Sequence, residues 1–139
     1  INYVQENENN NSGLKVRVQT LNNLLNGKSP KVIKIDVEGY ELFTLKGANE
    51  VLMKPDLEVI IIEINGHCRR YGNTEEEVFR FIASFGFIPV YYNSFTRKIN
   101  LLNHYNHDSD STIFIRDLKA ATFRVKRGKK IQIWKNYFI

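Results

Sequence analysis

Two apolar, β-branched runs constrain the fold of this chain more than any other feature. They are residues 31–37 (KVIKIDV) and 57–64 (LEVIIIEI). β-Branched residues favour strands, and the unbroken apolar stretch of the second run is typical of a strand buried on both faces of a parallel sheet. Residues 40–53 between them predict a helix with three leucines on one face, weakened or kinked at Gly47. Strand, helix and strand together predict a right-handed βαβ unit.

A second helix is predicted with equal clarity downstream. Thr74 and Glu77 form a capping box, apolar residues follow at helical spacing as far as Phe85, and Gly86 ends the pattern. Upstream, residues 15–19 (KVRVQ) alternate as a short strand does. Thr20 is then placed to cap a short helix that stops at Gly27.

The remaining strands are shorter and their evidence is more local. Pro89 within the strand predicted over 87–91 argues for an edge strand or a bulge. Further strands are expected over 99–102 and 112–115, and a hairpin over 123–134 that turns at Arg127-Gly128. The predicted fold class is α/β, a partial Rossmann-like mixed sheet with flanking helices.

Length and charge divide the chain into three parts. Its 139 residues fit one domain. Residues 1–14 are rich in Asn and Glu and predict a flexible lead-in, 15–116 form the body, and 117–139 form a basic tail. Residues 116–139 hold eight Lys or Arg and one acid, so the net charge of +5 arises in the tail. Such a tail is most often a solvated surface, although it can also meet an anionic partner.

Cysteine content and hydropathy predict a cytoplasmic protein. Cys68 is the only cysteine, which excludes an internal disulfide and suits a reducing compartment. No signal-peptide pattern is present, and the longest apolar run, 59–62, is far shorter than the roughly 20 residues of a membrane span.

Polar residues at the ends of the two main strands predict a functional site. Asp36 and Glu38 follow the first strand, whereas Glu63 and then His67 follow the second. Parallel strands place their carboxyl ends at one edge of the sheet, where ligands bind in open α/β folds. Acids within apolar strands are costly to bury unless they are paired or solvated. The alternative for the acids is that they only stabilise nearby helix N-termini by their negative charge. The alternative for His67 is that it is an ordinary loop residue. His104 and His107 lie three apart near two acids, a spacing common in polar loops, and we expect no metal there.

Residues 34–41 (KIDVEGYE), followed by 45–48 (LKGA), resemble the signature of FkbM-family methyltransferases. Three weaker features agree in order: residues 18–21 (VQTL), residues 59–64 (VIIIEI), and the predicted helix before Gly86-Phe87. The resemblance covers about residues 15–116.

The resemblance implies the class I methyltransferase fold, S-adenosylmethionine as methyl donor, and a hydroxyl of a small molecule, such as a sugar or polyketide, as acceptor. Asp36 and Glu38 would lie where the methyl sulfonium meets the acceptor, with Glu63 and His67 as further catalytic candidates. Asp36, Thr20 and Leu21 would contact the cofactor, the latter two near its adenine. No metal is implied.

The chain departs from the family in the part that should hold the cofactor. A class I site needs a glycine-rich turn after its first strand, but no two of the eight glycines stand in a G-x-G spacing. Asn22 also stands where the family has Asp. We therefore expect the first strands to be lacking. The strand over 31–37 would then be an open edge, covered by residues 1–20, by the tail in cis, or by a second copy in a homodimer.

Two functions of different classes follow from these observations. The first is an O-methyltransferase of this family, truncated and weakly active or inactive alone, in which Asp36, Glu38 or His67 takes the acceptor proton. The alternative is a non-catalytic interaction module that uses the basic tail, whose aromatic residues could stack on bases. Packing explains those aromatic residues more simply, so nucleic acid is an unlikely partner.

Overall fold

The computed structural model describes residues 16–135 and 137–138. A five-stranded mixed sheet forms the centre of the molecule, with strand order β1-β2-β5-β3-β4. The strands are β1 (Val32–Ile35), β2 (Val59–Glu63), β3 (Ile88–Asn93), β4 (Lys98–Leu101) and β5 (Ser111–Ile115). β1 and β2 are parallel, as predicted, whereas β5 runs antiparallel to both β2 and β3. The fold is therefore the predicted mixed α/β architecture.

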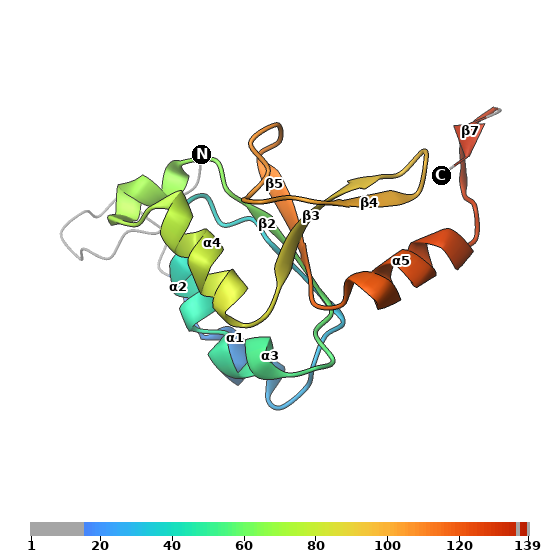
Figure 1. The fold of residues 1–139 in the computed structure, drawn as a ribbon. Coiled ribbons are helices and arrows are strands. Elements are labelled where there is room, and N and C mark those ends of the chain that lie inside the picture. The colour runs from blue at the N-terminus through green and yellow to red at the C-terminus, as the bar shows by residue number, and fades with distance from the viewer. Residues whose placement is uncertain (1–15, 136, 139) are drawn as a thin grey trace.

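Helices cover the two faces of the sheet unequally (Figure 1). One face carries α1 (Leu21–Leu25), α2 (Glu41–Lys46), α3 (Asn49–Met53) and α4 (Glu75–Ser84). Ile60 and Ile62 of β2 point into this layer and are fully buried with helix residues such as Leu45 and Ile82. Among the described residues, α5 (Leu118–Arg127) is the one helix on the second face. A groove of about 960 Å³ remains between this face and α5, lined by apolar residues that include Val59, Ile61 and Val125.

The helical predictions that rest on capping are confirmed. Thr74 and Glu77 form the predicted capping box of α4. The Thr20 side chain accepts a hydrogen bond from the Asn23 N–H and caps α1. The helix expected over 40–53 is divided at Gly47 into α2 and α3, which agrees with the predicted weakness at that glycine.

Two of the predicted strand elements do not form among the described residues. Residues 16–19 form no strand, and Val16 and Val18 are about 70% exposed. The hairpin expected to turn at Arg127-Gly128 is replaced by α5. The Asp117 side chain caps that helix by accepting from the Ala120 N–H. Leu118, Ala121 and Val125 line the groove at helical rather than strand spacing. A short antiparallel pair follows, β6 (Gln132–Trp134) with β7 (Tyr137–Phe138).

Pro89 does not mark an edge strand, because β3 lies between β5 and β4. The Pro89 carbonyl accepts a hydrogen bond from the Leu102 N–H, one residue beyond the end of β4. The proline therefore lies where pairing with β4 ends, and its missing N–H interrupts no regular ladder.

The other edge of the sheet is formed by β1. Within the described part of the chain, β1 pairs only with β2, and Val32 is 52% exposed. The tail does not cover this edge in cis as a strand, because residues 118–127 are helical and α5 contacts β4 at the opposite edge. Cover by a second copy of the chain stays a prediction. Among the described residues, no helix is long and apolar enough to cross a membrane.

Candidate functional site

The carboxyl ends of β1 and β2 bring the predicted acids together. The parallel register pairs Ile35 with Ile62. The residues that follow them, Asp36 and Glu63, therefore lie side by side. Their side chains share a hydrogen bond. Asp36 also accepts a hydrogen bond from Lys34, whose Nζ lies 2.6 Å from Oδ2. Because residues two apart on a strand share a face, these groups stand together on the second face of the sheet.

This arrangement moves the pKa values of the two acids in opposite directions. The hydrogen bond from Lys34, then the one to Glu63, lowers the pKa of Asp36 below its usual range. The hydrogen bond with Asp36, then burial, raises the pKa of Glu63, and the charges of Asp36, Glu38 and Asp110 add to this rise. The pair thus holds an ionised Asp36 beside an acid that keeps its proton to higher pH than usual.

Glu38 and His67 form a second pair at the same end of the sheet. His67 begins the short 3-10 helix η1 (His67–Tyr71), and its Nδ1 lies 2.9 Å from Oε2 of Glu38. The backbone of Glu38 is left-handed, with φ of +53°. Non-glycine residues adopt this conformation rarely, and it recurs at functional sites.

A close backbone approach fixes the two loops against each other. Gly39 has φ of +104°, and a Cβ there would lie 2.4 Å from the carbonyl oxygen of His67. The Gly39 N–H donates to Glu41, whose side chain is buried. The His67 N–H donates to Oδ1 of Asn65 at 3.2 Å. Only glycine permits this approach. The glycine at position 39 therefore lets the loop after β1 pack directly against the backbone of His67.

The structure thus brings together four of the six predicted site residues, namely Asp36, Glu38, Glu63 and His67. It places the other two elsewhere. Thr20 packs close to Gly47 at the end of α2, and Leu21 packs against the apolar core. No hydrogen bond among the described residues joins Thr20 or Leu21 to the acid cluster, and their adenine-side role stays a prediction.

Sequence reasoning missed Lys34 and Glu41 as site residues. Lys34 could have been found, because it precedes Asp36 by two positions and so shares its face of the strand. Glu41 gave a weaker signal, since an acid in the first turn of a helix is common. Only the structure shows that it is buried and holds the Gly39 N–H.

A polar pocket of about 480 Å³ adjoins the cluster beyond the end of β2. Asn65 and Gly66 line one side, and residues 105–110 of the loop before β5 line the other. Its outer loop reaches the cluster through Asp110, whose charge acts on Glu63 and whose carbonyl accepts from the Ile64 N–H at 2.7 Å. The pocket is therefore placed to hold a polar molecule beside the three acids and His67.

His104 and His107 belong to a different cluster. Their rings stack with centroids 5.4 Å apart, and His104 Nε2 contacts Oε2 of Glu76. Across residues 16–135, 137 and 138, no group of three or more His, Cys, Asp or Glu side chains is arranged to hold a metal ion.

Comparison with known proteins adds one finding. The family model described as the methyltransferase FkbM domain matches residues 2–89, more than half of the 139 residues. The matched range includes β1, β2 and the four residues that meet at their carboxyl ends. No curated protein and no solved structure matches the chain.

Proposed function

We propose, because the chain belongs to the FkbM methyltransferase domain family, that it uses S-adenosylmethionine to methylate a hydroxyl group of a small molecule. The observation that carries this proposal is the meeting of Asp36, Glu38, Glu63 and His67 at the carboxyl ends of adjacent parallel strands. Open α/β sheets bind their ligands at this edge.

The charges of the site fit the positively charged end of the cofactor. S-Adenosylmethionine, when bound, supplies a methyl group on a sulfonium cation. Lys34 favours the ionised form of Asp36 by lowering its pKa, and Glu38 is 39% exposed and pairs with His67. Because no G-x-G turn occurs in the 139 residues, we expect cofactor binding by this chain alone to be weak.

The chain's own groups have distinct roles in this proposal. The hydrogen bond with Asp36 raises the pKa of Glu63, and in its protonated form Glu63 can donate a hydrogen bond to an acceptor oxygen. Asp36, Glu38 and His67 are the groups that can accept the proton of the acceptor hydroxyl. The adjoining polar pocket holds the rest of the acceptor, since its walls offer side-chain oxygens from Asn65 and Asp110 together with backbone groups.

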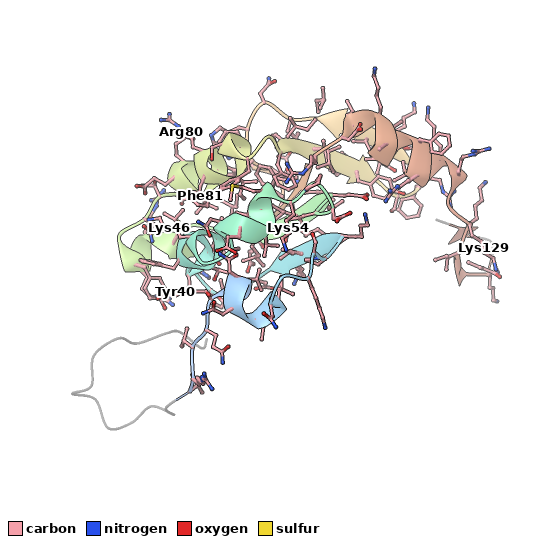
Figure 2. The ribbon with its side chains drawn as sticks, turned by 90° about the horizontal axis from the view of Figure 1, so that it is seen from below. Tyr40, Lys46, Lys54, Arg80, Phe81 and Lys129 are labelled. Carbon is pink, nitrogen blue, oxygen red and sulfur yellow. The ribbon has the colours of Figure 1, made fainter. Side chains whose placement is uncertain are left out.

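The alternative of an interaction module built on the basic tail has less support. Arg124 of α5 forms an ion pair with Glu58, and Arg127 lies over the ring of Phe123, so part of the tail's charge is satisfied within the chain. Lys129 lies at the end of the molecule remote from Tyr40 (Figure 2). Tyr40 directly follows Gly39 of the candidate site. The tail and the acid cluster are therefore separate features.

Calorimetric titration of the 139-residue chain with S-adenosylhomocysteine tests the proposal. We expect binding that Asp36→Asn weakens at least several-fold, with Asp56→Asn as the matched control because Asp56 precedes β2 at the other end of the sheet and pairs with Lys31. Absence of binding at millimolar ligand would count against cofactor use by this chain. Equal loss in both variants would show that Asp36 has no specific part in it.

A further inference from the structure

We infer that His67 is the general base of the proposed methyl transfer and that Glu38 is the residue that positions it. This inference rests on the proposed function and narrows its three candidate bases to one. It is carried by the contact between His67 Nδ1 and Glu38 Oε2 and by the backbone that fixes both residues.

The contact decides which nitrogen of His67 is available. A carboxylate only accepts hydrogen bonds, so the 2.9 Å contact with Glu38 requires the proton of the neutral imidazole to be on Nδ1. Nε2 then carries a lone pair. Among the described residues, nothing forms a hydrogen bond to Nε2, and the His67 side chain is 36% exposed. Nε2 is therefore open to a ligand.

The two other acids of the cluster are poorly suited to accept a proton. Lys34 lowers the pKa of Asp36, which makes its carboxylate a weaker base. The Glu63 carboxyl is engaged in its hydrogen bond with Asp36, which raises its pKa, so it is less available to an incoming hydroxyl than Nε2 of His67. The pair of Asp36 and Glu63 thus supplies negative charge, and His67 supplies the free lone pair.

The backbone holds this geometry without help from a ligand. Glu38 stands in the left-handed region, which turns its side chain from the end of β1 toward the loop after β2. Gly39 lets the two loops touch at the His67 carbonyl, and Asn65 holds the His67 N–H. Preorganisation of this kind is what positioned acid–base groups need.

The proposed step balances without a further reactant. The acceptor oxygen forms a bond to the methyl carbon as the carbon–sulfur bond of the sulfonium donor breaks and its electron pair stays on sulfur. The hydroxyl proton moves to Nε2 of His67. The resulting imidazolium remains next to the Glu38 carboxylate, which stabilises it.

The first test measures the tautomer of His67 by ¹⁵N NMR of the whole chain, at a pH where the imidazole is neutral. We expect the Nδ1–H form in the wild type and the Nε2–H form, which free histidine prefers, in Glu38→Ala. Glu76→Ala is the matched control, because Glu76 contacts Nε2 of His104 and should change that residue alone. An Nε2–H form of His67 in the wild type, or one that does not respond to Glu38→Ala, would overturn the positioning role.

The second test measures methyl transfer from labelled S-adenosylmethionine to a panel of polyols and methyl glycosides. We expect His67→Ala to lower kcat by roughly 100-fold or more, to leave S-adenosylhomocysteine affinity within about twofold, and to regain activity with added imidazole. Full activity of His67→Ala would overturn the base role while leaving the methyltransferase proposal intact. A wild type that neither binds S-adenosylhomocysteine nor transfers methyl would instead overturn the proposed function, and the base role with it.

Discussion

The carboxyl groups of Asp36 and Glu63 share a hydrogen bond across two parallel strands, and each acid changes the pKa of the other. Lys34 makes the pair unequal, because it contacts Asp36 at 2.6 Å and so favours ionisation of that acid. Glu63, the acid whose pKa is raised, stands next to the loop that carries His67.

Replacement of Glu63 by Gln should stabilise the fold at alkaline pH. A raised folded-state pKa means that Glu63 contributes stability below its ordinary value of 4.5 and loses it as pH rises through the folded value. Above that pH, the two ionised acids repel each other, which lowers the stability of the folded state. We expect Glu63→Gln to melt a few degrees higher than the wild type at pH 8, with a smaller difference at pH 4. Asp108→Asn, in an exposed loop, is the control, and equal melting of Glu63→Gln and wild type at pH 8 would contradict the prediction.

Removal of the Lys34 ammonium should raise the pKa of Asp36 toward its ordinary value of 3.8. Lys34→Gln keeps a side chain of similar length without the charge. Carbon-13 NMR titration of the Asp36 carboxyl measures the change directly. Because the lowered pKa of Asp36 contributes stability above 3.8 that is lost as pH falls through the folded value, Lys34→Gln should also reduce stability at neutral pH. An unchanged titration of Asp36 would show that Glu63 alone sets its pKa.

Alanine at Gly39 should destabilise the fold more than alanine at another left-handed glycine. At Gly39 the new Cβ would lie 2.4 Å from the His67 carbonyl oxygen, whereas at Gly27, with φ of +83°, it would meet nothing within 4 Å. Gly27→Ala is therefore a matched control that carries only the conformational cost, about 1–2 kcal/mol. Urea unfolding should show a loss for Gly39→Ala that exceeds this by at least about 1 kcal/mol. Equal losses would mean that the two loops separate easily.

Arg116 should be among the most important single side chains for stability. Its guanidinium donates to the carbonyls of Leu57, Phe85 and Leu52 and lies 4.2 Å from the ring centre of Phe87. Lysine cannot satisfy several carbonyls with a fixed planar fork, and each unsatisfied buried acceptor costs about 1–3 kcal/mol. We expect Arg116→Lys to lose roughly 2–4 kcal/mol in urea unfolding. Arg80→Lys, on an exposed helix surface, should change stability by less than about 0.5 kcal/mol.

The sequence predicted correctly those features that depend on residues close together in the chain. The capping box of α4 and the break at Gly47 depend on residues three or four positions apart, and both are confirmed. The parallel pairing of β1 and β2 also followed from their apolar content and the helix between them, and it placed Asp36 beside Glu63. The hairpin prediction for the tail was wrong because Phe123 and Val125 alternate as strand residues do. The cap that Asp117 provides favours a helix instead.

The finer geometry of the site depends on contacts that no local pattern reveals. The approach of Gly39 to His67 joins residues 28 positions apart, and it follows from how two loops leave adjacent strands. The left-handed backbone of Glu38 directly precedes this approach in the chain. Sequence could therefore indicate which side chains gather at this edge of the sheet, but not that Glu38 would contact Nδ1 of His67.

The place of Lys34 on β1 also bears on how the protein behaves in solution. β1 is only four residues long. Lys31 directly precedes it and Lys34 interrupts its apolar run, and their side chains are 59% and 61% exposed. Short strands and lysines are the means by which natural sheets discourage unwanted strand addition at an open edge. The ammonium group of Lys34 thus favours ionisation of Asp36 and also discourages strand addition at the open edge. Variants that remove this charge should be purified at low concentration and checked for aggregation by light scattering before their titration is interpreted.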